Sequence, residues 1–223
     1  MRRLVMMVSL AAAAGAPLVA EVSPIQTQRI ADAATVLNEI HAVPEKDIPQ
    51  ELWDHSACVL VIPGLKKAAF IFGGEYGKGL MSCRRNGGWS APLFMRLEKG
   101  SWGFQIGAQS IDLVLLVMNE GGIKKLLGNK VSLGAEISVA AGPVGRDARA
   151  ATDLQMRSEI LSYSRTQGLF AGVNISGGIL RGDMDANEDL YGVRVSSQEV
   201  LLGNSVPTPG VAEPLMKALR RET

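Results

Sequence analysis

The chain has 223 residues, of which 47% are hydrophobic and 20% are charged, and its formal net charge at pH 7 is +1. This composition supports a substantial core and indicates one globular domain, while the nearly neutral charge excludes the bulk basicity that drives nucleic-acid binding. The 25 glycines, set among many Val, Ile and Leu residues, indicate strands that are joined by tight turns.

The N-terminal segment has the pattern of a signal peptide. Arg2 and Arg3 precede an apolar stretch over residues 4–15, and small residues follow it. That stretch is short for a membrane span, which needs about 20 apolar residues. We therefore expect residues 1–20 to be removed on export, leaving a single domain over residues 21–223 in a periplasmic or extracellular location.

Two helices are predicted ahead of the first strand. Apolar residues between positions 23 and 43 recur at the spacing of one helix face. A shorter helix is expected after Asp47-Ile48-Pro49, where the acid can cap and the proline fits the first turn. Residues 57–72 then form a continuous apolar strand, interrupted at Pro63-Gly64, and such a run indicates burial on both faces of a sheet.

The glycine-rich segment over residues 73–79 predicts a turn between two strands. It lacks the Walker arrangement of a phosphate-binding loop, and the strand-like residues 80–85 follow it in place of a helix. The Asn86-Gly87-Gly88 sequence predicts another turn of the same type.

Two cysteines, Cys58 and Cys83, lie in strand-like segments. Neighbouring strands would allow them to form a disulfide, which persists in an oxidising compartment. Two small buried thiols fit the sequence equally well.

The rest of the chain alternates strand patterns with short helices. Strands are expected over residues 101–109, 111–118, 130–142, 155–165 and 169–180, and helices over residues 120–127, 185–191, 197–202 and 211–221. The elements together predict an α+β fold, mostly antiparallel, curved into a β sandwich or a partly closed barrel with helices at the N- and C-termini.

Four motifs occur in order along the chain. They are Trp89-Ser90-Ala91-Pro92, the GFQIGA sequence of residues 103–108, the AGPVGR sequence of residues 141–146, and Tyr163-Ser164-Arg165 with the GLFAGV sequence of residues 168–173. This series resembles the SYLF domain, and the likeness covers a core of about residues 48–192. Together with the expected signal peptide, it suggests an exported, bacterial-type member of that family. The resemblance implies binding of acidic phospholipids, phosphoinositides among them, and in fungal members association with actin filaments.

Basic residues are the candidate ligands for a lipid phosphate, because a guanidinium group binds phosphate oxygens as a fork and an ammonium group as a point charge. Arg146 and Arg165 lie within the family motifs, and Trp89, next to a turn and a proline, suits a membrane surface. Of two adjacent basic residues on a strand, only one can face a given ligand. The candidate set is Lys66, Lys67, Arg84, Arg85, Trp89, Lys124, Lys125, Arg146 and Arg165, with Lys78 and Lys130 as further basic positions.

No catalytic or metal site is predicted. The two histidines, His41 and His55, belong to no nucleophile or metal motif, and the acidic run over residues 183–189 lacks the glycine and final glutamate of a calcium loop. Capping of a helix by Asp183 or Asp185 explains that run. We therefore predict a non-catalytic protein without a cofactor that recognises acidic phospholipid headgroups; the alternative is a protein-interaction module that binds actin or an envelope partner.

Overall fold

The computed structural model describes residues 22–42, 48–69, 72–85, 87–102, 107–144, 157–166 and 169–221. The expected signal peptide and the candidate Arg146 lie outside these residues.

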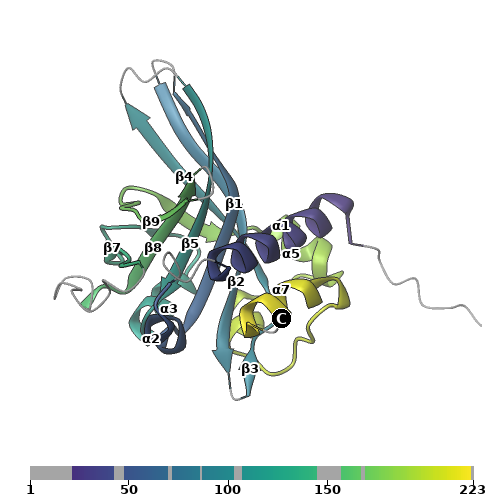
Figure 1. Cartoon of the computed structure of the whole chain (residues 1–223). Helices are drawn as coiled ribbons and strands as arrows, with labels where there is room; N and C mark the ends of the chain where they lie inside the picture. The colour runs from purple at the N-terminus through teal and green to yellow at the C-terminus, as the bar shows by residue number, and fades with distance from the viewer. Residues whose placement is uncertain are drawn as a thin grey trace, which may run out of the picture.

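A curled sheet of ten strands forms the centre of the molecule (Figure 1). Its four long strands are β1 (Cys58–Ala69), β2 (Phe72–Arg85), β4 (Leu93–Trp102) and β5 (Gly107–Val117). The short strands are β3 (Gly88–Trp89), β6 (Val131–Ser132), β7 (Val139–Ala141), β8 (Ile160–Thr166), β9 (Leu169–Gly172) and β10 (Ile179–Gly182). The strand order is β6-β10-β4-β2-β1-β5-β8-β7, with β3 on β2 and β9 on β8. Among these described strands, β7 and β8 are the one pair that runs in parallel. The sheet is a half-barrel, so the predicted α+β fold with a partly closed barrel is confirmed.

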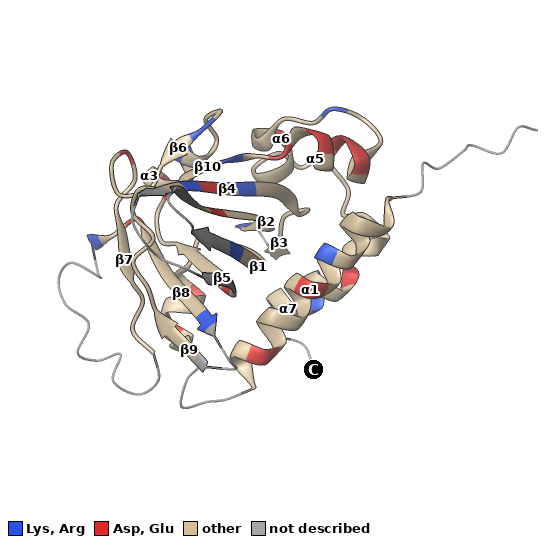
Figure 2. Cartoon of the chain, turned by 90° about the horizontal axis from the view of Figure 1, so that it is seen from above, with Lys and Arg blue, Asp and Glu red and all other residues tan. Residues whose placement is uncertain are grey.

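Helices at the two ends of the chain cover the open side of this half-barrel. Helix α1 (Pro24–His41) and helix α7 (Glu213–Arg220) lie side by side there (Figure 2). The other helices are α2 (Gln50–His55), α3 (Glu120–Leu126), α5 (Met184–Tyr191), α6 (Ser197–Leu201) and the 3-10 helix Gly210–Ala212. Among the described residues, none of the helices combines the length and the apolar character that crossing a bilayer requires.

The long strands bury both of their faces, as the continuous apolar runs predicted. Val59 and Val61 of β1 face the core that contains α1, α2 and α7. Leu60 and Ile62, which alternate with them, face a second core that contains residues of α3 and α6. Each fully buried side chain of this size contributes about 1.5–3 kcal/mol.

The glycine-rich segment 73–79 lies inside β2, so the prediction of a turn there is wrong. Its glycines serve a different purpose, because β1 bulges beside them between Ile62 and Leu65. A Cβ atom on Gly79 would lie 2.0 Å from the carbonyl oxygen of Val61, and one on Gly77 would lie 2.5 Å from Ile62. Gly79 is therefore needed for the close approach of the two backbones, and Gly77 leaves room for the side chains of Ile62 and Leu65.

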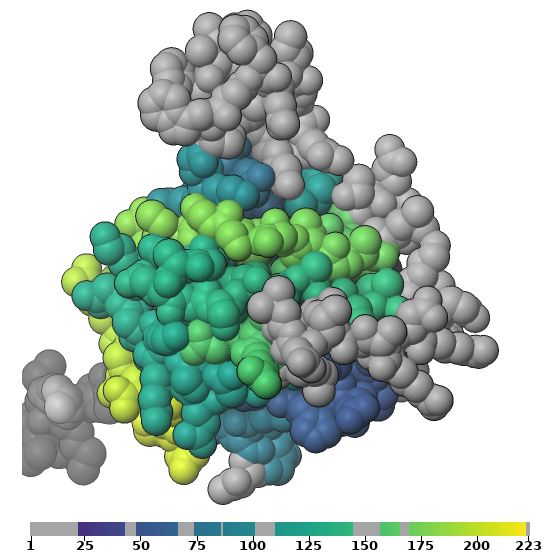
Figure 3. Space-filling view, turned by 90° about the vertical axis from the view of Figure 1, so that its left-hand side faces the viewer, coloured from purple at the N-terminus to yellow at the C-terminus, as the bar shows by residue number. Residues whose placement is uncertain are grey.

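Three of the predicted strands are interrupted in the structure. The strand predicted over residues 101–109 is divided, because β4 ends at Trp102 and β5 begins at Gly107. The C-terminal ends of β1 and β4 and the N-terminal ends of β2 and β5 project together beyond the rest of the molecule (Figures 1 and 3). The strands predicted over residues 130–142 and 169–180 are each two short strands separated by turns.

Cys58 and Cys83 form a disulfide, which settles the two alternatives that the sequence allowed. The two residues are directly opposite each other on β1 and β2, and both are fully buried. The bond links positions 25 residues apart in the sequence.

Replacing both cysteines by alanine is expected to lower the free energy of unfolding by about 3 kcal/mol, since the cross-link restricts a loop of this length in the unfolded chain. Urea unfolding with and without a thiol reductant measures the effect. Reductant should lower the urea midpoint of the wild-type protein and leave that of the double variant unchanged. A wild-type midpoint that is the same with and without reductant would contradict the presence of the disulfide.

A Gly79→Ala substitution is expected to lower the free energy of unfolding by about 3 kcal/mol, because the new methyl group overlaps the backbone of β1. Gly100→Ala on β4 is the matched control, since a Cβ atom there meets nothing within 4 Å. Thermal unfolding of the two variants should separate them clearly, and equal melting temperatures would show that β2 can move away from β1 at no cost.

Candidate functional site

A cleft of about 530 Å³ lies between α1 and the concave face of the sheet. We call it the α1 cleft. Its charged lining residues come from one helix and four strands: Arg29, Asp32, Lys66, Lys78, Asp112 and Arg165.

The strand register brings the sheet residues of this cleft together. Lys66 of β1 lies opposite Tyr76 of β2 and opposite Ser110 of β5. Lys78 and Asp112 lie two residues farther along β2 and β5, and residues two apart on a strand share a face. The polar floor of the α1 cleft therefore consists of neighbouring positions on three adjacent strands.

Helix α1 closes the cleft from the other side. Its apolar stripe, which includes Ile30, Leu37 and Ile40, is buried against the sheet and α7. Arg29 and Asp32 are three residues apart and so lie on a common side of the helix, at the edge of this stripe.

Arg165 fixes the position of α1 relative to the sheet. Its guanidinium group donates to Asp112 of β5 at 2.7 Å and also forms an ion pair with Glu39 of α1. Asp112 accepts a further hydrogen bond from the backbone N–H of Gly64 at 2.9 Å. Burial raises the pKa of the Asp112 carboxyl group, and this N–H acts in the opposite direction. Arg165 is thus engaged in internal ion pairs, and its contacts give it a structural role.

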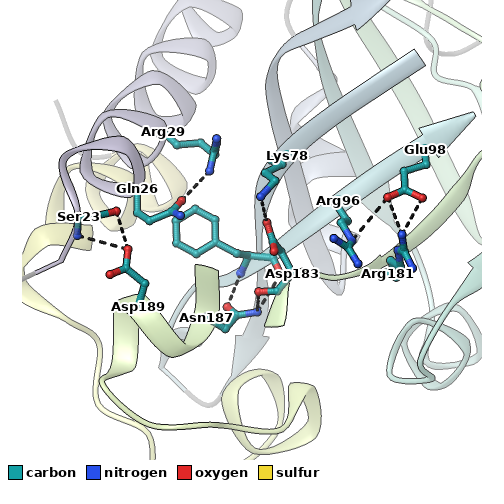
Figure 4. A network of polar contacts seen from close by, with 11 residues as sticks. Ser23, Gln26, Arg29, Lys78, Arg96, Glu98, Arg181, Asp183, Asn187 and Asp189 are labelled. Atoms are coloured by element: carbon teal, nitrogen blue, oxygen red, sulfur yellow. Dashed lines mark hydrogen bonds and ion pairs between the residues drawn. The ribbon is translucent and has the colours of Figure 1, made fainter. Parts of the chain in front are cut away.

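Lys78 is paired in a similar way. Its ammonium group lies 2.6 Å from Asp183, whose side chain is 1% exposed (Figure 4). Asp183 stands at the start of α5 but forms no side-chain capping hydrogen bond, so the capping role expected of Asp183 is wrong. The nearby Asn187 holds α5 to β4, since its side chain bonds both the N–H and the carbonyl group of Phe94.

Two cations of the α1 cleft have no carboxylate partner within the described ranges. Arg29 donates to the neutral side chain of Gln26 at 2.6 Å (Figure 4). Lys66 is exposed and forms neither an ion pair nor a hydrogen bond with any residue that the structure describes. These two positions are the ones where an external anion gains a new partner without breaking an internal ion pair.

Three other predicted site residues meet near the C-terminal end of β2, away from Lys66. Arg84 stacks on the ring of Trp89 at 4.5 Å and donates to the carbonyl group of Trp53 at 2.9 Å. Arg85 donates to the carbonyl groups of Leu202, at 2.9 Å, and of Gly203. Trp89 is half-buried. The two arginines therefore tie separate segments together as well as carrying charge.

The remaining predicted site residues are not brought together with these groups. Lys124 and Lys125 lie on α3, where Lys124 is highly exposed beside Glu120 and Lys125 pairs with Glu159 at 2.8 Å. The side chain of Lys67, like Arg146, lies outside the described residues.

Sequence reasoning missed Arg29 as a site residue, because it was the only basic residue of a helix that was expected to pack on its own domain. The available signal was its position beside the apolar stripe of that helix. Within the described part of the chain, no group of His, Cys, Asp and Glu side chains could hold a metal ion.

Comparison with known proteins relates this chain to one family. Residues 98–222 match the model of the Ysc84 family, described as Las17-binding protein actin regulator. The Ysc84 protein of Saccharomyces cerevisiae is 34% identical over 164 residues, which are 72% of this chain and 35% of that protein. The human SH3 domain-containing YSC84-like protein 1 is 30% identical over 194 residues, which are 84% of this chain and 56% of that protein. The chain thus spans about one third to just over one half of the length of these relatives.

Arg165→Gln is expected to lower the free energy of unfolding by about 2 kcal/mol, because it leaves the Asp112 carboxylate without its cation in a partly buried site. Arg181→Gln is the control: Arg181 also pairs with a carboxylate, that of Glu98, but the pair is more exposed, and the expected loss is about 0.5 kcal/mol. Chemical unfolding measures both, and equal losses would refute the structural role of Arg165.

Proposed function

The chain belongs to the Ysc84 family, also called the SYLF domain family, and from this premise we propose that it is a non-catalytic module that binds anionic phospholipid headgroups. The family description is that of an actin regulator and names no reaction. The ligand in this proposal is a phosphate group on a membrane surface, phosphoinositide-like in its chemistry.

The observation that carries the proposal is the pair of uncompensated cations in the α1 cleft. Arg29 and Lys66 line the same cleft from opposite walls, one on α1 and one on β1. Arg165 and Lys78 contribute positive charge nearby, but Asp112, Glu39 and Asp183 neutralise it. A phosphate placed between Arg29 and Lys66 gains two charge-assisted hydrogen bonds at no internal cost.

Oxygen atoms in the same cleft suit a hydroxylated headgroup. Tyr76 and Ser110 flank Lys66 in the sheet, and Asp32 lies across from them on α1. Hydroxyl and carboxylate oxygens accept hydrogen bonds from sugar-like hydroxyl groups. A ligand that carries both phosphate and hydroxyl groups therefore matches the lining better than a bare phosphate does.

We also propose that the protein acts after export, in the periplasm or outside the cell. The disulfide between Cys58 and Cys83 supports this location, because such bonds persist in oxidising compartments and are rare in the cytosol. The signal-peptide pattern of residues 1–20 supports it independently.

A second candidate function is protein interaction, with actin or an envelope protein as the partner. The family description and the names of the relatives favour it. Co-sedimentation with actin filaments distinguishes the two functions, since a protein that binds only lipid stays in the supernatant.

Lys66→Glu is expected to weaken binding to vesicles that contain a phosphoinositide by about tenfold, because it reverses one charge where the headgroup phosphate sits. Lys124→Glu is the matched control: it makes the same change on the exposed face of α3, outside the cleft. Vesicle flotation with anionic and neutral lipid measures the affinities, and Lys124→Glu should bind as the wild-type protein does.

Two results would overturn the lipid proposal. One is that the wild-type protein floats with neither anionic nor neutral vesicles. The other is that Lys66→Glu and Lys124→Glu lose affinity equally, which would mean that overall charge and not the α1 cleft governs attraction to the membrane.

A further inference from the structure

Four arginines gather at the end of the molecule where β2, β3 and α7 meet. Arg84 and Arg85 end β2, while Arg220 and Arg221 end α7. They line two adjoining clefts of about 350 and 620 Å³, and the two clefts share Arg84 and Trp89. We call this region, with Trp89 and Leu202, the arginine–tryptophan end.

The lining of this region carries a large excess of positive charge. Asp54, which lies 3.8 Å from Arg84, is the only acidic residue among the described residues that line the two clefts. Burial lowers the pKa of the Arg84 guanidinium group; Asp54 opposes that effect, and the positive charge of Arg221 adds to it. The folded chain thus keeps like charges close together, in contrast to the α1 cleft with its carboxylates.

Stacking and backbone hydrogen bonds hold the guanidinium groups of Arg84 and Arg85 in place, and Arg220 pairs at 3.0 Å with Glu213, which lines neither cleft. Arg84 lies over Trp89 and donates to the carbonyl groups of Trp53 and Ser56, and Arg221 lies 5.3 Å from the ring of Trp53. Cations fixed in this way lose little conformational entropy when an anion binds. Arg84 and Arg220 still keep 35% and 34% of their side-chain surface exposed, so a ligand can reach them.

We propose that the arginine–tryptophan end binds an acidic segment of a partner protein. Carboxylates of the segment pair with Arg84 and Arg220, and an apolar side chain of the segment covers Leu202, which is 44% exposed at the rim. This site shares no residue with the α1 cleft, and the inference does not depend on the lipid proposal.

The shape of the region favours a peptide over a bilayer. The guanidinium groups line recessed clefts, and the indole of Trp89 is half-buried with Arg84 stacked on it. Trp89 therefore cannot insert its ring into the headgroup layer, as a membrane-anchoring tryptophan does. Leu202 is the only large hydrophobic residue that is exposed in the described lining of the two clefts, and one such residue buries little surface in lipid.

Gly88 provides a direct test, because it lines both clefts and a Cβ atom there meets nothing within 4 Å. Gly88→Glu places a carboxylate among the arginines, where it competes with an acidic ligand. Gly100→Glu is the matched control, since it adds the same side chain to open space on β4, which contributes no residue to these clefts. The probe is a fluorescein-labelled, glutamate-rich peptide with one leucine, and binding to the purified protein is followed by fluorescence anisotropy.

The expected result is that Gly88→Glu weakens binding of this peptide by at least about tenfold, while Gly100→Glu changes it by less than about twofold. Thermal unfolding of both variants shows whether the fold is kept. If Gly88→Glu fails to fold, Arg220→Gln replaces it, with Arg194→Gln as its control, because both arginines form exposed pairs with a glutamate.

Three outcomes would overturn the inference. The first is equal affinity for the glutamate peptide and for its glutamine counterpart. The second is peptide binding that Gly88→Glu and Arg220→Gln leave unchanged. The third is that the peptide does not bind while Gly88→Glu abolishes flotation with anionic vesicles, which would assign this end of the molecule to a membrane surface.

Discussion

Helix α1 must bury an apolar stripe against the concave face of a curled sheet, and the rest of the molecule is arranged around that contact. Ile30, Leu37 and Ile40 achieve the burial together with α7. A straight helix cannot follow a curved surface along its whole length, so a polar gap is left beside the stripe, and that gap is the α1 cleft. Arg165 then fixes its width, because its ion pairs connect β8 to β5 and to α1 at the same time.

The two concentrations of basic residues differ in how their charge is balanced. In the α1 cleft, Asp112, Glu39 and Asp183 neutralise Arg165 and Lys78, and only Arg29 and Lys66 are left without a carboxylate in the described ranges. At the arginine–tryptophan end, stacking and carbonyl groups stabilise Arg84 and Arg85, and neither interaction cancels charge, while the exposed carboxylates of Asp54 and Glu213 offset part of the charge of Arg84 and Arg220. A carbonyl oxygen holds a guanidinium group in place, but it carries no net charge, so the positive charge of the guanidinium group still acts on a ligand in the cleft. The first arrangement suits a single phosphate between two cations, and the second suits several carboxylates of one chain.

Features that depend on neighbours along the chain could be predicted from the sequence. The spacing of apolar residues gave α1 within two residues at each end, and the Asp47-Ile48-Pro49 sequence indicated where α2 begins. The continuous apolar run of β1 correctly indicated burial on both faces. Features that depend on neighbours across the sheet could not. Gly77 and Gly79 were predicted as turn residues, because the neighbouring residues in the sequence do not show that β1 bulges close to them in the sheet. The disulfide stayed undecided for the same reason, since it depends on the register that sets Cys58 opposite Cys83.

The candidate site shows the same difference between features that depend on neighbours along the chain and features that depend on distant residues. The sequence offered Arg165 as a phosphate ligand, and the fold places it in the lining of the α1 cleft. Its contacts there depend on Asp112 and Glu39, which are 53 and 126 positions away in the sequence. Conversely, Arg84, Arg85 and Trp89 were chosen one by one, and only the fold shows that the end of α7 adds two more arginines beside them.

The two proposed sites lie on a common element, strand β2, and this has a consequence for how they work together. Lys78 lines the α1 cleft from the middle of β2, and Arg84 lines the other site from its end. Between them, Leu80 and Met81 are fully buried in the two cores, and Cys83 is cross-linked to β1. A strand fixed in this way transmits little movement, so a ligand in one site leaves the side chains of the other in place. Binding of a headgroup and of an acidic partner is therefore expected to be additive, which is the behaviour of a module that brings a protein to a membrane and not of a switch that exchanges one for the other.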